Sequence, residues 1–145
     1  MHSVRTLGHW EARRVIDKLT EVLLQSKRSA TIAVADHHGE LIALSRLDGA
    51  PLSSILNAAN KAWTAARERK SSADIGRASR DPHTGFDIAF YADRRYIGWG
   101  GGVPVVHDGQ VLGAIGVSGL PEQEDIELAQ LGVQLLASAP LSSQA

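Results

Sequence analysis

Residues 101–119 read Gly-Gly-Val-Pro-Val-Val-His-Asp-Gly-Gln-Val-Leu-Gly-Ala-Ile-Gly-Val-Ser-Gly and contain a strong hairpin signal. Asp108-Gly109 favours a tight turn, and apolar and small residues alternate on both sides of it. The pattern predicts one strand over residues 103–106 and a return strand over residues 110–118. Neither face of the return strand is very polar, so we expect both faces to be covered and the strand to lie centrally in a sheet.

A second hairpin is expected earlier in the chain. Small and β-branched residues alternate over residues 31–35, a polar stretch follows, and a second alternating run extends over residues 40–47. Residues 96–99 have the composition of another strand, which the glycines at 100–102 would interrupt. Together these segments predict an antiparallel sheet of about five strands.

Helical spacing of apolar or small residues marks the segments between the strands. The expected helices cover residues 6–27, 53–69, 72–77 and the segment from Pro121 onward. Thr6 is the expected N-cap of the first helix, and Ser53 or Ser54 that of the second. Five alanines of the second helix would let it lie close to the small side chains of residues 31–35. The last helix is expected to bury the stripe Ile126, Ala129, Val133 and Leu136.

These elements predict an α+β fold in which helices pack on an antiparallel sheet. A chain of 145 residues is long enough for one hydrophobic core. We expect a single domain over residues 1–145, with its core in residues 6–137 and a frayed tail over residues 138–145.

The composition narrows the function classes and the compartment. The chain has 15 Lys and Arg against 16 Asp and Glu, so we expect no basic face for nucleic acid or an anionic membrane. It has no cysteine, which excludes disulfides, thiolate nucleophiles and Cys-ligated metals. No apolar run resembles a signal peptide or a membrane span. We therefore expect a cytoplasmic protein that recognises a small molecule.

Three motifs in a fixed order carry a family resemblance. The first is Val34-Ala-Asp-His-His-Gly-Glu-Leu-Ile-Ala-Leu-Ser-Arg-Leu-Asp-Gly-Ala-Pro51, the second is Lys61-Ala-Trp-Thr-Ala65, and the third is segment 101–119 followed by Glu124-Asp125. In order and spacing they resemble the GlcG/HbpS-like family, also described as haem-degrading domains. The same family includes the C-terminal domain of PduO-type corrinoid adenosyltransferases. The resemblance covers most of residues 6–137.

The resemblance implies a profilin-like fold and symmetric homo-oligomers, and some relatives bind haem or other tetrapyrroles. Haem is therefore the cofactor to consider. The chain departs from the family at Leu47, where Met is usual, and over residues 77–94, which are polar where many relatives are rich in glycine and proline. This second segment should border the site, so the resemblance does not identify the ligand by itself.

The candidate ligand-binding residues are Arg46, Gly49, Lys61, Gly101 and Gly102. Arg46 shares a strand face with Asp48, which begins the turn into a helix. This arrangement suits either an anion site or a turn cap in which the two charges pair. Lys61 matches the family and would meet a carboxylate of a ligand or of a neighbouring subunit, or else belong to a solvated stripe. The two glycines would allow a ligand to approach the backbone closely, or would serve as a structural kink.

The candidate catalytic residues are Asp48, His83 and Asp125. His83 is the preferred acid-base group or axial haem ligand, although an exposed loop position is the ordinary alternative. Asp125 has a simpler role open to it, because a carboxylate in the first turn of a helix is stabilised by the helix dipole. No metal site is predicted, since neither H-x-x-x-H nor H-E-x-x-H occurs. Trp63, Tyr96 and Trp99 are expected in the core or an interface, with stacking on a planar ligand as the alternative.

Three functions are open at this point. The first is a binding module that holds haem or another small planar ligand near Asp48, Lys61 and the glycines at 100–102. The second is a cofactor-independent enzyme of a catabolic pathway, acting by acid-base chemistry on a small carboxylated or oxygenated metabolite held by Arg46 or Lys61. The third is an assembly protein with a vestigial site.

The first two functions require Arg46 and Asp48, Lys61 and the glycines at 100–102 to converge around one cavity.

Overall fold

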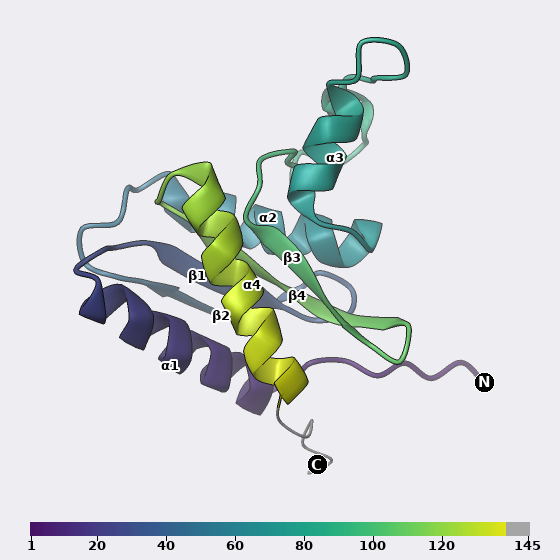
Figure 1. The fold of residues 1–145 in the computed structure, drawn as a ribbon. Helices are drawn as coiled ribbons and strands as arrows, with labels where there is room; N and C mark the ends of the chain where they lie inside the picture. Colours follow the sequence, from purple (N-terminus) through teal and green to yellow (C-terminus); the bar gives the residue numbers. More distant parts are fainter. Residues whose placement is uncertain (139–145) are drawn as a thin grey trace.

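The computed structural model describes residues 1–138 and contains one four-stranded sheet covered by helices (Figure 1). The elements in chain order are α1 (His9–Gln25), β1 (Thr31–Ala35), β2 (Leu41–Arg46), α2 (Ser54–Glu68), α3 (Ser72–Ser79), the 3-10 helix η1 (Ile88–Phe90), β3 (Gly102–His107), β4 (Gln110–Ser118) and α4 (Glu122–Ser138). The α+β class is confirmed. The predicted frayed tail lies, apart from Ser138, outside the described residues.

The strands are all antiparallel and lie in the order β2-β1-β4-β3. β4 therefore has a neighbour on each side, as its two apolar faces predicted. Ile32 pairs with Val117 and Val34 with Ile115 along the β1–β4 ladder, which joins the two hairpins at the centre of the sheet.

Residues 96–99 do not form the strand that their composition predicts. The amide of Tyr96 is bonded to the carbonyl of Asp93 in a turn, and the amide of Ile97 is bonded to Oγ1 of Thr64 on α2. The backbone at Gly98 packs directly against Gly76 of α3. Because this segment finds its partners on two helices, it does not add to the sheet.

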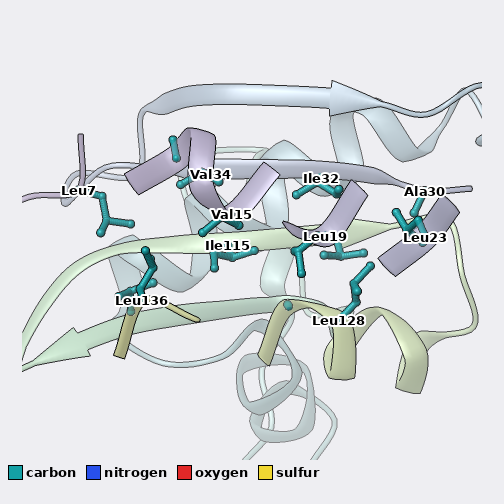
Figure 2. Close-up of a cluster of buried hydrophobic side chains, with 14 of the residues drawn as sticks. Leu7, Val15, Leu19, Leu23, Ala30, Ile32, Val34, Ile115, Leu128 and Leu136 are labelled. Atoms are coloured by element: carbon teal, nitrogen blue, oxygen red, sulfur yellow. The ribbon is translucent and has the colours of Figure 1, made fainter. Parts of the chain in front are cut away.

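Helices α1 and α4 lie on one face of the sheet and α2 lies on the other (Figure 1). Leu19 of α1 and Leu136 of α4 meet Ile32 and Ile115 in the main core, which Figure 2 shows between the helices and the sheet. The buried stripe of α4 differs from the predicted one at two positions. It consists of Asp125, Leu128, Ala129, Gly132 and Leu136. Ile126 and Val133 are only partly buried, because α4 presents Gly132 to the core.

Helix α2 lies unusually close to the sheet, as its alanines predicted. Ala58 and Ala62 pack on Ala33 and Ala35 of β1. A Cβ atom at Gly116 of β4 would overlap the carbonyl oxygen of Ala58. The small residues on both sides therefore fix the depth at which α2 sits.

The predicted N-cap at Thr6 is wrong. Helix α1 begins at His9 with Gly8 as its N-cap, and the amide of Gly8 donates to Oε2 of Glu11 at 3.1 Å. The hydroxyl of Thr6 instead accepts from the amide of His37 at 2.9 Å, tying the N-terminal segment to the β1–β2 turn. Among the described residues, no helix is long and apolar enough to cross a membrane.

The start of α2 is as expected, although its serines do not cap it through their side chains. Ser53 is the N-cap residue without a side-chain capping bond. The hydroxyl of Ser54 is buried and bonds to Thr31 Oγ1 at 2.7 Å and to the Pro51 carbonyl. Helix α3 extends two residues beyond its predicted end, and it projects away from the sheet with the segment that follows it (Figure 1).

Candidate functional site

A buried ion pair joins α2 to α4. Lys61 is 1% exposed and Asp125 is 3% exposed. The Lys61 Nζ atom lies 3.3 Å from Asp125 Oδ2 and donates to the carbonyl of Val117 in β4 at 3.0 Å. Asp125 Oδ1 accepts from the amide of Leu120 at 3.0 Å. The pair therefore connects α2, β4 and the start of α4 through hydrogen bonds between groups removed from water.

Gly101 and Gly102 form one wall of this buried pair. Gly101 has φ +128°, and a Cβ atom there would lie 3.0 Å from Lys61 Nζ. A Cβ at Gly102 would overlap the carbonyl oxygen of Lys61. The carbonyl of Gly101 also accepts from the amide of Val117 at 3.0 Å. Because they lack a Cβ atom, these glycines allow the backbone to approach Lys61 closely. The group that they approach is therefore a residue of the protein and not a ligand.

Burial shifts the pKa of both members of the pair. Desolvation lowers the pKa of Lys61, and the attraction of Asp125 opposes that change without cancelling it. Desolvation likewise raises the pKa of Asp125 against the pull of Lys61. The Lys61 ammonium lies 5.3 Å from the centroid of the Trp99 ring, which is a further favourable contact. The positive charge of Lys61 is thus committed to groups of the protein.

Of the predicted site residues, the structure brings together Lys61, Asp125, Gly101 and Gly102, and the others lie elsewhere. Arg46, Asp48 and Gly49 lie at the end of β2, and no ion pair joins Arg46 to Asp48 among the described side chains. The carbonyl of Asp48 accepts from the hydroxyl of Ser29 at 2.5 Å. The strand order accounts for this: β2 and β3 occupy opposite edges of the sheet, so two strands separate the end of β2 from the glycines that begin β3.

His83 also stands apart. It is exposed in the turn after α3, where its amide donates to Asp81 Oδ1 at 2.8 Å. The three candidate catalytic residues therefore lie in three separate places, and their proposed roles in proton transfer stay predictions. Within residues 1–138, no group of three or more His, Cys, Asp or Glu side chains is placed to hold a metal ion.

A groove of about 310 Å³ lies beside the glycine wall, between α3, β3 and α4. Its polar lining includes Gln123, Gln130 and Arg77, and the guanidinium of Arg77 is paired with Asp74 at 2.6 Å. Gly101 and Gly102 also line this groove, but Lys61 does not. A ligand there would rest on the wall without meeting the lysine behind it.

A larger hollow of about 460 Å³, which we call the aromatic hollow, lies in the irregular segment after α3. It is lined by Ile88, Ala89, Tyr91, Asp93, Arg94 and Tyr96. The rings of Tyr91 and Tyr96 are 4.2 Å apart between centroids with an interplanar angle of 33°. Arg94 forms no ion pair within 4 Å with any described side chain.

Three contacts hold the aromatic hollow in place. The Arg95 guanidinium bonds to Asp93 at 2.8 Å, and this hydrogen bond lowers the pKa of Asp93 to about 2. Arg95 also covers the ring of Trp63 at 4.3 Å, and Tyr96 packs edge-on against the same ring. Sequence reasoning missed Tyr91, because residues 70–95 read as a polar mixture. The apolar and aromatic residues within residues 86–91 were the signal that could have identified it.

The chain is similar to known proteins in both sequence and fold. Residues 7–134 match the model of the family described as haem degrading protein HbpS-like. The chain is 40% identical to protein GlcG of Escherichia coli K12 over 113 residues, which cover 77% of this chain and 81% of GlcG. It also resembles the crystal structure of the Klebsiella pneumoniae protein ORFY, with a TM-score of 0.89, 27% identity and 96% of each chain covered.

A further similar structure is the crystal structure of a complex between PduOC and haem. It superimposes with a TM-score of 0.82 and covers 97% of this chain and 99% of PduOC. The two sequences are 21% identical, so this likeness shows a shared fold.

Proposed function

The chain belongs to the HbpS-like family, and on that premise we propose that it binds haem or a closely related tetrapyrrole in the aromatic hollow. The match of residues 7–134 to the family model confirms the family resemblance that the three sequence motifs indicated. The proposal draws on the family description and on the haem present in the PduOC complex. The observation that carries it is a hollow lined by two closely packed tyrosines and by a guanidinium that has no acidic partner within 4 Å among the described residues.

The residues of the aromatic hollow fit the chemistry of such a ligand. A tyrosine phenolate is an established axial ligand of haem iron, and Tyr91 is the candidate for this role. Aromatic rings and the side chains of Ile88 and Ala89 suit the face of a planar macrocycle. The Arg94 guanidinium suits a propionate. When bound, haem would supply an iron centre; the side chains named here bind and orient it.

Lys61, Asp125, Gly101 and Gly102 support this proposal indirectly. Their contacts fix the start of β3, and Ser72 of α3 is tied to the same place because its hydroxyl donates to the Trp99 carbonyl at 2.7 Å. The base of α3 and one end of the irregular segment are thereby anchored to the sheet. Under this proposal the family-matching residues position the ligand segment and do not touch the ligand.

Haemin titration followed by absorbance tests the proposal. The wild type should give a saturable Soret change. Tyr91→Phe should alter the shape of the bound spectrum, because the phenolate ligand is lost. Arg94→Gln should weaken binding about ten- to hundredfold, as expected for the loss of a charge-assisted hydrogen bond.

Arg77→Gln is the matched control, because it removes an exposed guanidinium from the groove beside Gly101. Its titration should match the wild type. If the wild type gives no saturable change, haem binding is refuted. If binding depends on Arg77 and ignores Tyr91 and Arg94, the aromatic hollow is the wrong site.

A further inference from the structure

We propose that a second hollow, at the C-terminal end of α2, binds a small oxyanion with two negative charges, such as a dicarboxylate or a phosphate. We call it the cationic hollow. Its volume is about 270 Å³, and it is lined by His37, His38, Arg67, Arg69 and Tyr96. This inference does not rest on haem binding, although Tyr96 borders both hollows.

Two chain segments bring nitrogen donors to this one place. His37 and His38 come from the β1–β2 turn, whereas Arg67 and Arg69 come from the last turn and the C-cap of α2. Four of the five lining side chains therefore present nitrogen atoms, and none is a carboxylate. Arg67 is held over the ring of Trp63 at 4.9 Å, which limits the positions that its guanidinium can take.

Arg69 and His37 position each other. The Nδ1 atom of His37 lies 2.7 Å from the carbonyl of Val111, and a carbonyl can only accept, so Nδ1 carries a proton. The Nε2 atom is then free to accept from Arg69 Nη2, which lies 3.1 Å away. Arg69 Nη1 also donates to the carbonyl of His37 at 3.3 Å. The guanidinium is thus oriented by an imidazole ring and a backbone carbonyl, neither of which is an acid.

The carboxylates near the cationic hollow are engaged with other groups. Asp36 Oδ1 accepts from the amides of His38 and Glu40 at 2.9 and 3.0 Å. Glu40 approaches Arg95 at 3.8 Å, and Glu68 interacts with the phenol of Tyr96. Among the described side chains, neither Arg67 nor Arg69 has an acidic partner within 4 Å.

Two guanidinium groups without an acidic partner within 4 Å among the described side chains face one polar hollow, and together they favour an anion with more than one charged oxygen. Each guanidinium is a planar donor that matches a carboxylate or phosphate group. A monovalent anion would satisfy only one of the two charges. Succinate and inorganic phosphate therefore represent the two sources of this chemistry, and acetate is the monovalent comparison.

Isothermal titration of the full chain with succinate, phosphate and acetate at constant ionic strength tests the proposal. Saturable binding of succinate or phosphate is expected, with acetate weaker. The stronger of the two divalent probes identifies the ligand class. Arg67→Gln should weaken binding about ten- to hundredfold.

Arg69→Gly is the sharper variant. Arg69 has φ +61°, a left-handed conformation that glycine adopts without strain. The change therefore removes the guanidinium without straining the backbone. It should abolish anion binding and leave the haemin titration unchanged, which separates this proposal from haem binding. Arg77→Gln should bind the anion like the wild type. Absence of saturable binding by both divalent probes, or unchanged binding by Arg69→Gly, would overturn the inference.

Discussion

Helix α2 carries positive charge into two contrasting settings. At Lys61 the ammonium is enclosed, and a carboxylate, a backbone carbonyl and an indole ring surround it. At Arg67 and Arg69, about two turns further on, the guanidinium groups face a polar hollow without an acidic partner among the described residues. The comparison shows that a lysine matching a family motif can serve the fold, while arginines outside the motif are better placed to meet a ligand.

The largest effect on stability is expected when the enclosed charge of Lys61 is removed. Lys61→Met leaves Asp125 buried without its cation, so the free energy of unfolding should fall by about 3–5 kcal/mol. Urea unfolding of the purified variant measures this loss. A loss below about 1 kcal/mol would mean that Lys61 is not the structural element described here.

The pH dependence of the same variant tests the cause of the loss. The folded-state pKa of Asp125 is raised above its ordinary value of 3.8 because burial outweighs the attraction of Lys61. A carboxyl group with a raised folded-state pKa stabilises the fold below its unfolded pKa, and that contribution disappears as the pH rises through the folded pKa. Removing Lys61 raises the pKa of Asp125 further.

Lys61→Met should therefore lose stability relative to the double variant Lys61→Met/Asp125→Asn as the pH rises above 3.8. The asparagine keeps an oxygen to accept from the Leu120 amide but cannot ionise. Urea unfolding at several pH values compares the two. Parallel curves would show that a buried carboxylate is not the source of the instability.

The next effect concerns the seat of α2 on the sheet. Gly116→Ala should lower the free energy of unfolding by about 1–3 kcal/mol, because the added methyl overlaps the backbone of Ala58. Gly132→Ala in α4 is the matched control. Its methyl would meet the ends of the Ile115 and Val15 side chains, and the gain in helix propensity offsets part of the cost. Equal losses in thermal unfolding would contradict the close seating of α2.

The smallest effect is expected at the exposed support of the aromatic hollow. Arg95→Gln should return the pKa of Asp93 from about 2 toward 3.8, because the hydrogen bond from Arg95 is its largest cause. A carboxyl with a depressed pKa contributes stability above its unfolded pKa and loses it as the pH falls through the folded value. The small acid-side contribution between pH 3.8 and about 2 should therefore disappear. Carboxyl NMR titration measures the change; an unaltered Asp93 pKa would refute the contact.

The strands within the two hairpins could be predicted from the sequence because their signals are local. Alternation and turn residues such as Asp108-Gly109 mark a strand without reference to distant residues. The sequence also predicted the close contact between α2 and β1, since alanine and glycine are the residues that permit it. Residues 96–99 carried a similar signal and failed, because Thr64 of α2 and Gly76 of α3 supply the contacts that a neighbouring strand would have made.

The candidate site was harder to predict because it depends on strand order. Nothing local places β2 and β3 at opposite edges, so the sequence could not show that two strands separate the end of β2, beside Asp48, from Gly101 at the start of β3. Lys61 does meet a carboxylate, but it is Asp125 of the same chain and not the ligand or neighbouring subunit that the sequence led us to expect. Tyr91 and Arg69, to which we assign ligand contacts, had no periodic or motif signal, since one lies in an irregular segment and the other at a helix end.

The tight seating of α2 has a mechanical consequence. Its backbone touches glycine positions in β3 and β4, so the helix has no clearance in which to slide or tilt. Lys61 and Arg67 are separated by about 9 Å along the helix axis, at about 1.5 Å per residue. The helix thus holds Arg67 at a fixed distance from the buried Lys61, so a ligand at the C-terminal end of α2 cannot be accommodated by a shift of the helix.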